Sequence, residues 1–517
     1  MKTSKLLTAV GALAALAVFP SGALAGSTPV RSPTGLSIQA PDAAASGAAA
    51  GAACTLTDPA SGKLVYSSSY VHCYTPQQIA ANYGVDVVQA QHKGEGQTIV
   101  LVDSYGSPTA ATDLNTFYAT FYKAQGYPAP DFEQVCSGKC HDYNNTAHGA
   151  NGQSGPAAAA GWAGEANLDI EWAYAMAPAA HIVLLAVPPA ETEGVQGLPN
   201  LFKAMSDAVD KYPSGTIFSQ SFGVTEETFG GAAATQTAKF DAVYKKGNAK
   251  GDTFLASSGD DGSFGVSKTH RDTGSYDHPT VGWPASSPYV TAVGGTQLQS
   301  GWTWNPTSDI PFNSDGTPNM GYFGWTDGGN TEAVWNESWL PAASGGGPSL
   351  IYPRPSWQSS VASRIPGDHR GVPDVAWNAA VDGGVLVYTS FFPDVNRTGW
   401  HVYGGTSAAS PQVAGVLALA NQARKAAGKS PLGQVNPTLY AIGGSNAGAF
   451  RDIAPVTEGT AASGQLVDNQ DWDYLGDGVP VQRDAVPGWP TTTGWDMTTG
   501  FGTPRAPALV AALVAAP

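Results

Sequence analysis

Residues 404–411 place a serine between a pair of glycines and the start of a long helix, in the order Gly404-Gly405-Thr406-Ser407-Ala408-Ala409-Ser410-Pro411. The apolar pattern that follows predicts a helix over residues 407–425. A serine in the first turn of a helix exposes its hydroxyl, and its own amide and the helix dipole can stabilise a developing negative charge. The pattern makes Ser407 a candidate nucleophile. A serine that only caps the helix is the alternative.

Short apolar runs elsewhere in the chain predict buried strands, because they lack the polar alternation of half-exposed strands. The runs cover residues 98–102, 181–185, 253–256 and 385–388. Helical patterns lie between them at residues 113–125, 164–175, 201–212 and 235–246. This alternation predicts an α/β fold with a mostly parallel central sheet flanked by helices. Catalytic groups are then expected at the carboxyl ends of the strands.

The composition narrows the range of partners. Only 13% of the 517 residues are charged, and 41 acidic residues outnumber 25 basic ones. The surface therefore has no basic patch for nucleic acid, and we expect none to bind. No internal repeat or interior linker divides the chain, so we expect one large domain with long loops over residues 54–517, acting as a monomer.

The first residues have the pattern of a secretory signal. Lys2 and Lys5 precede an apolar run that ends at Ala23-Leu24-Ala25, so we expect a signal peptide over residues 1–25 and a secreted, extracellular protein. The apolar runs at both ends are too short for a membrane anchor, and none is expected. Residues 26–53 are rich in Ala, Gly, Ser and Pro, which predicts a flexible linker or a short pro-segment.

The chain has four cysteines, and none forms a zinc-like CxxC pair. In an exported protein an even number of cysteines suggests disulfides. Three pairings are possible, and proximity in the sequence favours Cys54 with Cys73 and Cys136 with Cys140.

The segment around Ser407 resembles the serine motif of the subtilisin superfamily, whose classical members use an Asp, a His and a Ser. None of the nine histidines lies in an H-G-T-H-like segment leading a helix, and His148 lies in a loop of Gly, Ser and Asn. Asp103 stands where a subtilisin aspartate would. Without a histidine to orient, it is expected to be a hydrogen-bonding group at a strand end. A subtilisin-type set of Asp103, His148 and Ser407 is the alternative.

Carboxylates occupy the place of the missing imidazole. Glu165 and Asp169 precede a stretch that is similar to the subtilisin segment after the histidine helix, Ala177-Pro178-Ala179-Ala180-His181-Ile182. Being four residues apart on a helix, they share a face, and two like charges there are relieved by sharing one proton. A carboxylate still accepts a proton near pH 4, where histidine is already protonated. The alternative is a solvated acidic helix face.

Asp260 is the candidate for stabilising the oxyanion. It follows the strand at residues 253–256, where subtilisins carry an asparagine that donates to the oxyanion. An aspartate can donate a hydrogen bond only when it is protonated, which low pH and partial burial favour. We choose Asp260 rather than Asp261 for this role. An aspartate of a turn beside glycine is the alternative.

Together Glu165, Asp169, Asp260 and Ser407 resemble the Glu/Asp/Asp/Ser set of the sedolisin family, serine-carboxyl peptidases that include the kumamolisins. Further similar segments run from about residue 73 to residue 504, among them Ser219-Gln220-Ser221-Phe222-Gly223, Ser344-Gly345-Gly346-Gly347 and Val372-Pro373-Asp374-Val375-Ala376. The resemblance implies an acid-acting endopeptidase that cleaves proteins or peptides through an acyl-enzyme on Ser407, with Glu165 as the base that Asp169 orients. An inactive secreted binding protein is the alternative of another class.

The resemblance also implies one structural calcium ion. Its ligands would be the side chains of Asp452 and Asp496 with the carbonyls of Ile453, Thr492 and Gly494, and such hard oxygen atoms suit calcium. A polar loop without metal is the alternative. Two features depart from the family pattern. The stretch before Cys73 is shorter than the usual pro-domain, and an insert-like loop at residues 456–490 could reshape or misalign the calcium region.

Overall fold

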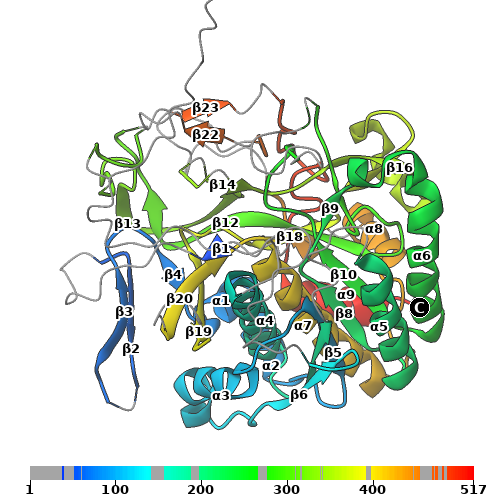
Figure 1. Cartoon of the computed structure of the whole chain (residues 1–517), viewed down its shortest axis with the longest axis horizontal. Coiled ribbons are helices and arrows are strands. Elements are labelled where there is room, and N and C mark those ends of the chain that lie inside the picture. Colours follow the sequence, from blue (N-terminus) through cyan, green and yellow to red (C-terminus); the bar gives the residue numbers. More distant parts are fainter. Residues whose placement is uncertain are drawn as a thin grey trace, which may run out of the picture.

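The computed structural model describes residues 38–39, 52–59, 61–140, 156–187, 197–265, 276, 278–308, 310–314, 317–337, 339–340, 342–391, 398–445, 447–453, 468–470, 472–474, 480–482 and 486–517. Within these residues, one sheet has the strand order β13-β12-β10-β8-β5-β7-β6, and β18 pairs with β12 (Figure 1). The strands are β5 (Thr98–Ser104), β6 (Asp131–Cys136), β7 (His181–Val187), β8 (Ile217–Gln220), β10 (Thr253–Ser257), β12 (Thr291–Trp304), β13 (Trp325–Val334) and β18 (Val375–Asn378). All pairs are parallel except β12 with β13, which confirms the predicted sheet.

The central strands are continuous apolar segments because both faces of the sheet are covered. Every residue of β5 is buried. Ile99 and Leu101 belong to the core on one face, whereas Val100 and Val102 belong to the core on the other. The strands predicted at residues 98–102, 181–185 and 253–256 lie inside β5, β7 and β10.

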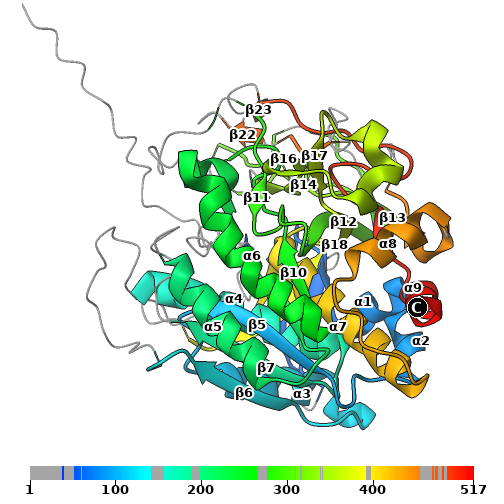
Figure 2. The same ribbon diagram turned by 90° about the vertical axis from the view of Figure 1, so that its right-hand side faces the viewer.

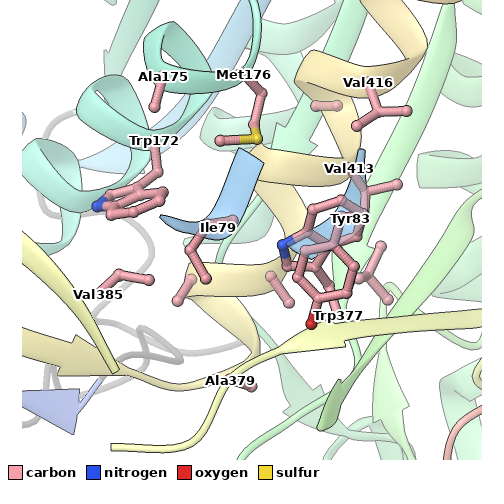
Figure 3. Packing of buried hydrophobic residues seen from close by; sticks show 14 of the residues in the cluster. Ile79, Tyr83, Trp172, Ala175, Met176, Trp377, Ala379, Val385, Val413 and Val416 are labelled. Atoms are coloured by element: carbon pink, nitrogen blue, oxygen red, sulfur yellow. The ribbon is translucent and has the colours of Figure 1, made fainter. Parts of the chain in front are cut away.

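Two pairs of helices cover the two faces of the sheet (Figure 2). One pair is α4 (Pro156–Met176) with α7 (Thr406–Ala426), and the other is α5 (Leu198–Lys211) with α6 (Ala233–Lys250). Figure 3 shows Trp172 and Met176 of α4 in the same core as Val413 and Val416 of α7. The two helices approach closely at Gly415, where an added Cβ would lie 2.4 Å from Cβ of Met176.

The strand predicted at residues 385–388 forms, but not in the central sheet. It is β19 (Gly384–Thr389), in a separate four-stranded sheet of order β1-β20-β19-β4, with β1 (Ile38–Gln39), β4 (Cys73–Tyr74) and β20 (Gly399–Gly404). Its burial comes from α4, since Nε1 of Trp172 donates to the carbonyl of Leu386 at 3.0 Å. The sequence pattern reports burial, and it does not distinguish which sheet supplies it. The small sheet matters because β20 leads directly to Ser407.

The described part of the chain contains further, shorter helices and strands. The helix α1 begins with a capping box between Thr75 and Gln78 and ends at Gly84, whose φ of 72° favours glycine. These shorter elements include α1 (Pro76–Tyr83), α2 (Val85–Gln89), α3 (Ala110–Phe121), α8 (Asn436–Ser445), α9 (Ala506–Ala515), β2 (Cys54–Thr57), β3 (Leu64–Ser68), β16 (Gly347–Pro353), β17 (His369–Val372), β21 (Phe450–Arg451) and β24 (Thr503–Pro504).

Both predicted disulfides are present. Cys54 pairs with Cys73, which ties the β2–β3 hairpin to β4, and Cys136 pairs with Cys140 at the end of β6. No helix in the described residues is long and apolar enough to cross a bilayer. The predicted signal peptide lies outside the described residues, and so does nearly all of the predicted linker.

Candidate active site

Glu165 and Asp169 lie on consecutive turns of α4, and both side chains are completely buried. This burial excludes a solvated acidic face. The Ser221 hydroxyl donates to Oδ1 of Asp169 at 2.9 Å. Burial, together with the nearby carboxyl groups of Asp103 and Glu165, raises the pKa of Asp169 well above its ordinary value. Both neighbouring carboxyl groups thus oppose the ionisation of Asp169, as expected for acids that share a proton.

Asp103 has a different environment from the one predicted. It lies in β5 and is completely buried, but neither of its carboxylate oxygens has a hydrogen-bond partner in the described part of the chain. The predicted role as a hydrogen-bonding group at a strand end is therefore wrong. Burial raises the pKa of Asp103 to about 8, and its charge acts on Asp169. The sequence feature that could have identified Asp103 as part of the site is its position near the carboxyl end of a buried strand.

Ser407 is the second residue of α7. Gly405, just before the helix, has a φ of 99°, which favours glycine because it has no Cβ. Pro411 lacks the amide that would otherwise bond the carbonyl of Ser407. The Ser407 hydroxyl is buried and has no hydrogen-bond partner among the described residues, so it does not cap the helix.

Asp260 is held against the residue that precedes Ser407. Its Oδ1 accepts hydrogen bonds from the amide and from the hydroxyl of Thr406, both at 2.8 Å. Gly259, with a φ of 123°, lets the chain turn sharply after β10, and its amide donates to the Thr406 hydroxyl at 3.2 Å. These contacts fix the carboxyl group of Asp260 beside the residue that precedes Ser407 and distinguish it from an ordinary turn aspartate.

The end of β8 connects both helices of the site. Ser221 follows β8 and bonds Asp169 of α4, while the hydroxyl of Ser219 lies 2.8 Å from that of Ser410 in α7. In addition, a Cβ added at Gly164 would lie 2.4 Å from the hydroxyl oxygen of Tyr403 in β20, so the turn of α4 before Glu165 adjoins the strand that leads to Ser407. Sequence reasoning gave Ser221 no role. The sequence feature that could have identified Ser221 is its position directly after a buried strand.

A cavity of about 70 Å³ lies beside Asp260. Five of its thirteen lining residues are glycine, and the charged residues in its lining are Asp260 and Asp261. The lining residues are Gly223, Val224, Thr225, Ser257, Ser258, Gly259, Asp260, Asp261, Gly262, Phe264, Thr280, Gly282 and Gly345.

The five predicted calcium ligands lie in two loops that are in contact. The Gly494 amide donates to Oδ2 of Asp452 at 2.8 Å, and the Thr492 amide donates to Oδ2 of Asp496 at 2.9 Å. No group of three His, Cys, Asp or Glu side chains gathers as a metal site in the described residues. The two carboxylates and the backbone carbonyls, including that of Ile453, are nevertheless hard oxygen donors, so the residues fit calcium in type.

His148, the base in the alternative subtilisin-type set, lies outside the described residues.

The chain is similar to members of a known protein family. Residues 95–441 match the model of the subtilase family. The chain is similar to kumamolisin from Bacillus sp. (strain MN-32), with 32% identity over 453 residues, 85% of this chain and 64% of kumamolisin. It is also similar to dog tripeptidyl-peptidase 1, with 31% identity over 58% of this chain and 43% of that protein. The chain thus spans less than two thirds of the length of these relatives.

Two matches concern sedolisin itself. Sedolisin from Pseudomonas sp. (strain 101) is 31% identical over 290 residues, 54% of this chain and 41% of that protein. A solved structure of Pseudomonas sedolisin, a serine-carboxyl proteinase in complex with two molecules of pseudo-iodotyrostatin, aligns with a TM-score of 0.60 and 24% identity over 85% of this chain and 98% of that one. This structural match bears out the subtilisin-like fold.

Proposed function

Because this chain belongs to the subtilase family and is homologous to its sedolisin and kumamolisin members, we propose that it is a serine-carboxyl endopeptidase that hydrolyses peptide bonds in acid. The observation that carries the proposal is the buried carboxyl cluster of Asp103, Glu165 and Asp169, beside a helix that begins with a serine of unbonded hydroxyl. Completely buried acids cost stability and are typical of functional sites.

In the proposed reaction, Glu165 accepts the proton of the Ser407 hydroxyl as Oγ attacks the carbonyl carbon of the substrate. Asp169 acts through Glu165, because the proton that the buried acids share keeps one carboxylate available as a base. Glu165 then returns the proton to the leaving amine. Water repeats the sequence on the acyl-enzyme and releases Ser407.

The oxyanion of each tetrahedral intermediate would be stabilised by the amide of Ser407 and by protonated Asp260. The contacts of Asp260 support this role. Its Oδ1 already accepts two hydrogen bonds from Thr406, so the acid proton belongs on Oδ2. A carboxylic acid donates only while it is protonated, so this arrangement suits acid conditions.

We extend the proposal to the rest of the chain. Residues 1–25 would direct secretion, residues 26–53 would form a linker or short pro-segment, and residues 54–517 would form the peptidase domain, acting as an extracellular monomer on proteins or peptides. Calcium, held by Asp452, Asp496 and the carbonyls of Ile453, Thr492 and Gly494, would tie two loops together. It would take no part in the chemistry.

The test is cleavage of a peptide library across pH 3–8 with mapping of the products, combined with labelling of Ser407 by an active-site-directed acyl reagent. We expect internal cleavage that is fastest in acid, and labelling that Ser407→Ala abolishes. A maximum at neutral pH that requires His148 would indicate a subtilisin-type site. A chain that neither cleaves nor labels would be a binding protein.

A further inference from the structure

We propose that Asn469 is a positioning residue that fixes the loop carrying Asp260 in its catalytic orientation. The proposal rests on the function proposed above. Asn469 belongs to the insert-like loop at residues 456–490, and two short segments of that loop, residues 468–470 and 486–490, lie against the candidate site and are called the stem here. The sequence left open that the loop could reshape or misalign the calcium region. The stem also contacts residues 259–263, which are called the oxyanion loop here.

The backbone of Asn469 holds the oxyanion loop directly. Its carbonyl accepts a 2.9 Å hydrogen bond from the amide of Ser263, three residues after Asp260. Gly262 has a φ of 61°, and a Cβ added there would lie 2.1 Å from the carbonyl oxygen of Asn469. The contact is therefore so close that only glycine fits opposite Asn469.

The side chain of Asn469 holds the opposite wall of the same loop. Its Nδ2 donates to the carbonyl of Ser344 at 3.0 Å. The segment after Ser344 runs along the oxyanion loop, since the Gly345 amide donates to the carbonyl of Gly259 at 2.8 Å. The chain before it does the same, because the amide of Ala343 donates to the carbonyl of Asp260 at 2.9 Å. Asn469 therefore bonds the oxyanion loop at Ser263 and the neighbouring segment at Ser344, and these two segments determine where Asp260 lies.

Asn469 is itself firmly held. It is completely buried. Its side-chain Oδ1 accepts from the Trp489 backbone amide at 2.6 Å, and its backbone amide donates to the Trp489 carbonyl at 3.2 Å. The same Trp489 carbonyl accepts from the hydroxyl of Thr498 at 2.6 Å. All polar groups of the Asn469 side chain thus have partners, which makes it a rigid support and not a surface contact.

Asn469 bonds the segments on both sides of Asp260, which a residue that only stabilised its own loop would not do. Moreover, Asn336 anchors the same stem independently, because its Nδ2 donates to the carbonyls of Asp468 and Gln470 at 3.0 and 2.8 Å. The stem is therefore expected to stay in place when the Asn469 side chain is removed, while the wall at Ser344 loses its partner.

The experiment compares Asn469→Ala with the matched stem variant Gln470→Ala in the full chain. Gln470→Ala removes the side-chain bond to the Val486 carbonyl and leaves both segments at Asp260 intact. For Asn469→Ala we expect kcat to fall about tenfold to a hundredfold with KM changed by less than about twofold, because a displaced oxyanion group weakens only the transition state. The Ki of a peptide aldehyde, whose bound form carries the same oxyanion, should rise by the same factor.

Asn469→Asp, which keeps the bond from Trp489 and loses the amide that donates to Ser344, provides a second variant should the alanine variant fold poorly. At the acidic pH of the assay, a protonated aspartate can still donate to the Ser344 carbonyl, so we expect a smaller loss of kcat and a matching, smaller rise in the aldehyde Ki. The inference is wrong if the folded Asn469 variants match Gln470→Ala in kcat and aldehyde Ki, or if KM absorbs the whole loss. If the unmodified chain neither cleaves peptides nor binds the aldehyde, the proposed function itself fails.

Discussion

The amide and the hydroxyl of Thr406 both donate 2.8 Å hydrogen bonds to Oδ1 of Asp260. Because Thr406 immediately precedes Ser407, these two bonds tie the carboxyl group of Asp260 to the residue beside the proposed nucleophile. The two bonds also occupy Oδ1 as an acceptor, so a proton on this carboxyl group belongs on Oδ2. A protonated Asp260 would therefore have a hydrogen-bond donor at Oδ2, and an ionised Asp260 would have none.

Replacing Asp260 tests this relationship. Asp260→Ala should lower kcat by about 10²–10³-fold, the usual effect of losing one oxyanion donor. Asp260→Asn should keep both bonds from Thr406 and donate through Nδ2 at every pH, so its kcat/KM should fall off at a higher pH than that of the wild type. Profiles of kcat/KM against pH measure both effects. An alanine variant with wild-type kcat would exclude Asp260 from the oxyanion site.

Glu165→Ala should cost nearly as much activity as Ser407→Ala, roughly 10⁴-fold or more in kcat, because the base and the nucleophile act as one unit. Glu171→Gln is the matched control. Glu171 is another completely buried carboxyl group of α4, but it accepts from the Tyr388 amide at 3.0 Å instead of facing Asp169. Its variant should keep most of the activity, as should His148→Ala. Full activity of Glu165→Ala would remove the base assignment.

Ser221→Ala should shift the acid limb of the kcat/KM profile to higher pH. The Ser221 hydroxyl bonds Oδ1 of Asp169 and so lowers the pKa of that carboxyl group, against the larger effect of burial. Without this donor, the pair should hold its second proton up to a higher pH, by about half a unit to one unit. The shift is measured from initial rates at pH 2–6. An unchanged acid limb would mean that Asp169 does not control the ionisation of the base.

The fold was predictable because it depends on local patterns, and the four candidate catalytic residues could be proposed because their segments also resemble those of a known family. Apolar runs marked β5, β7 and β10, and small residues marked the turn before Ser407. The role of Asp103 was not predictable, because its effect on Asp169 depends on burial and on contact across residues far apart in the chain. The same holds for Asn469, whose partners come from three separate segments.

The protein should be more stable in acid than near pH 8. Burial raises the pKa of Asp103 to about 8 and those of Glu226 and Glu337 to about 7, against about 4 in an unfolded chain. The folded state therefore holds protons that the unfolded state has released. This contribution is complete below about pH 4 and is lost as the pH rises through 7 and 8.

The measurement is the melting temperature at pH 4.5 and pH 8, with an expected fall of about 5 °C or more. Asp103→Asn should reduce the difference by raising the melting temperature at pH 8, because the amide cannot ionise. A melting temperature that is higher at pH 8 than at pH 4.5 in the wild type would contradict the prediction.

Removal of calcium should lower the melting temperature by about 3 °C or more, since an ion that binds only the folded chain stabilises it by its binding free energy. The measurement is thermal unfolding with EGTA and with added calcium, which does not depend on peptidase activity. Asp452→Asn is the informative variant, because the amide oxygen can still accept from Gly494 while one negative charge is lost. It should melt like the wild type in EGTA and respond little to calcium, whereas Asp368→Asn, at an exposed position elsewhere, should respond fully. If EGTA leaves the wild-type melting temperature unchanged, the two loops are held by their own hydrogen bonds and the calcium proposal is wrong.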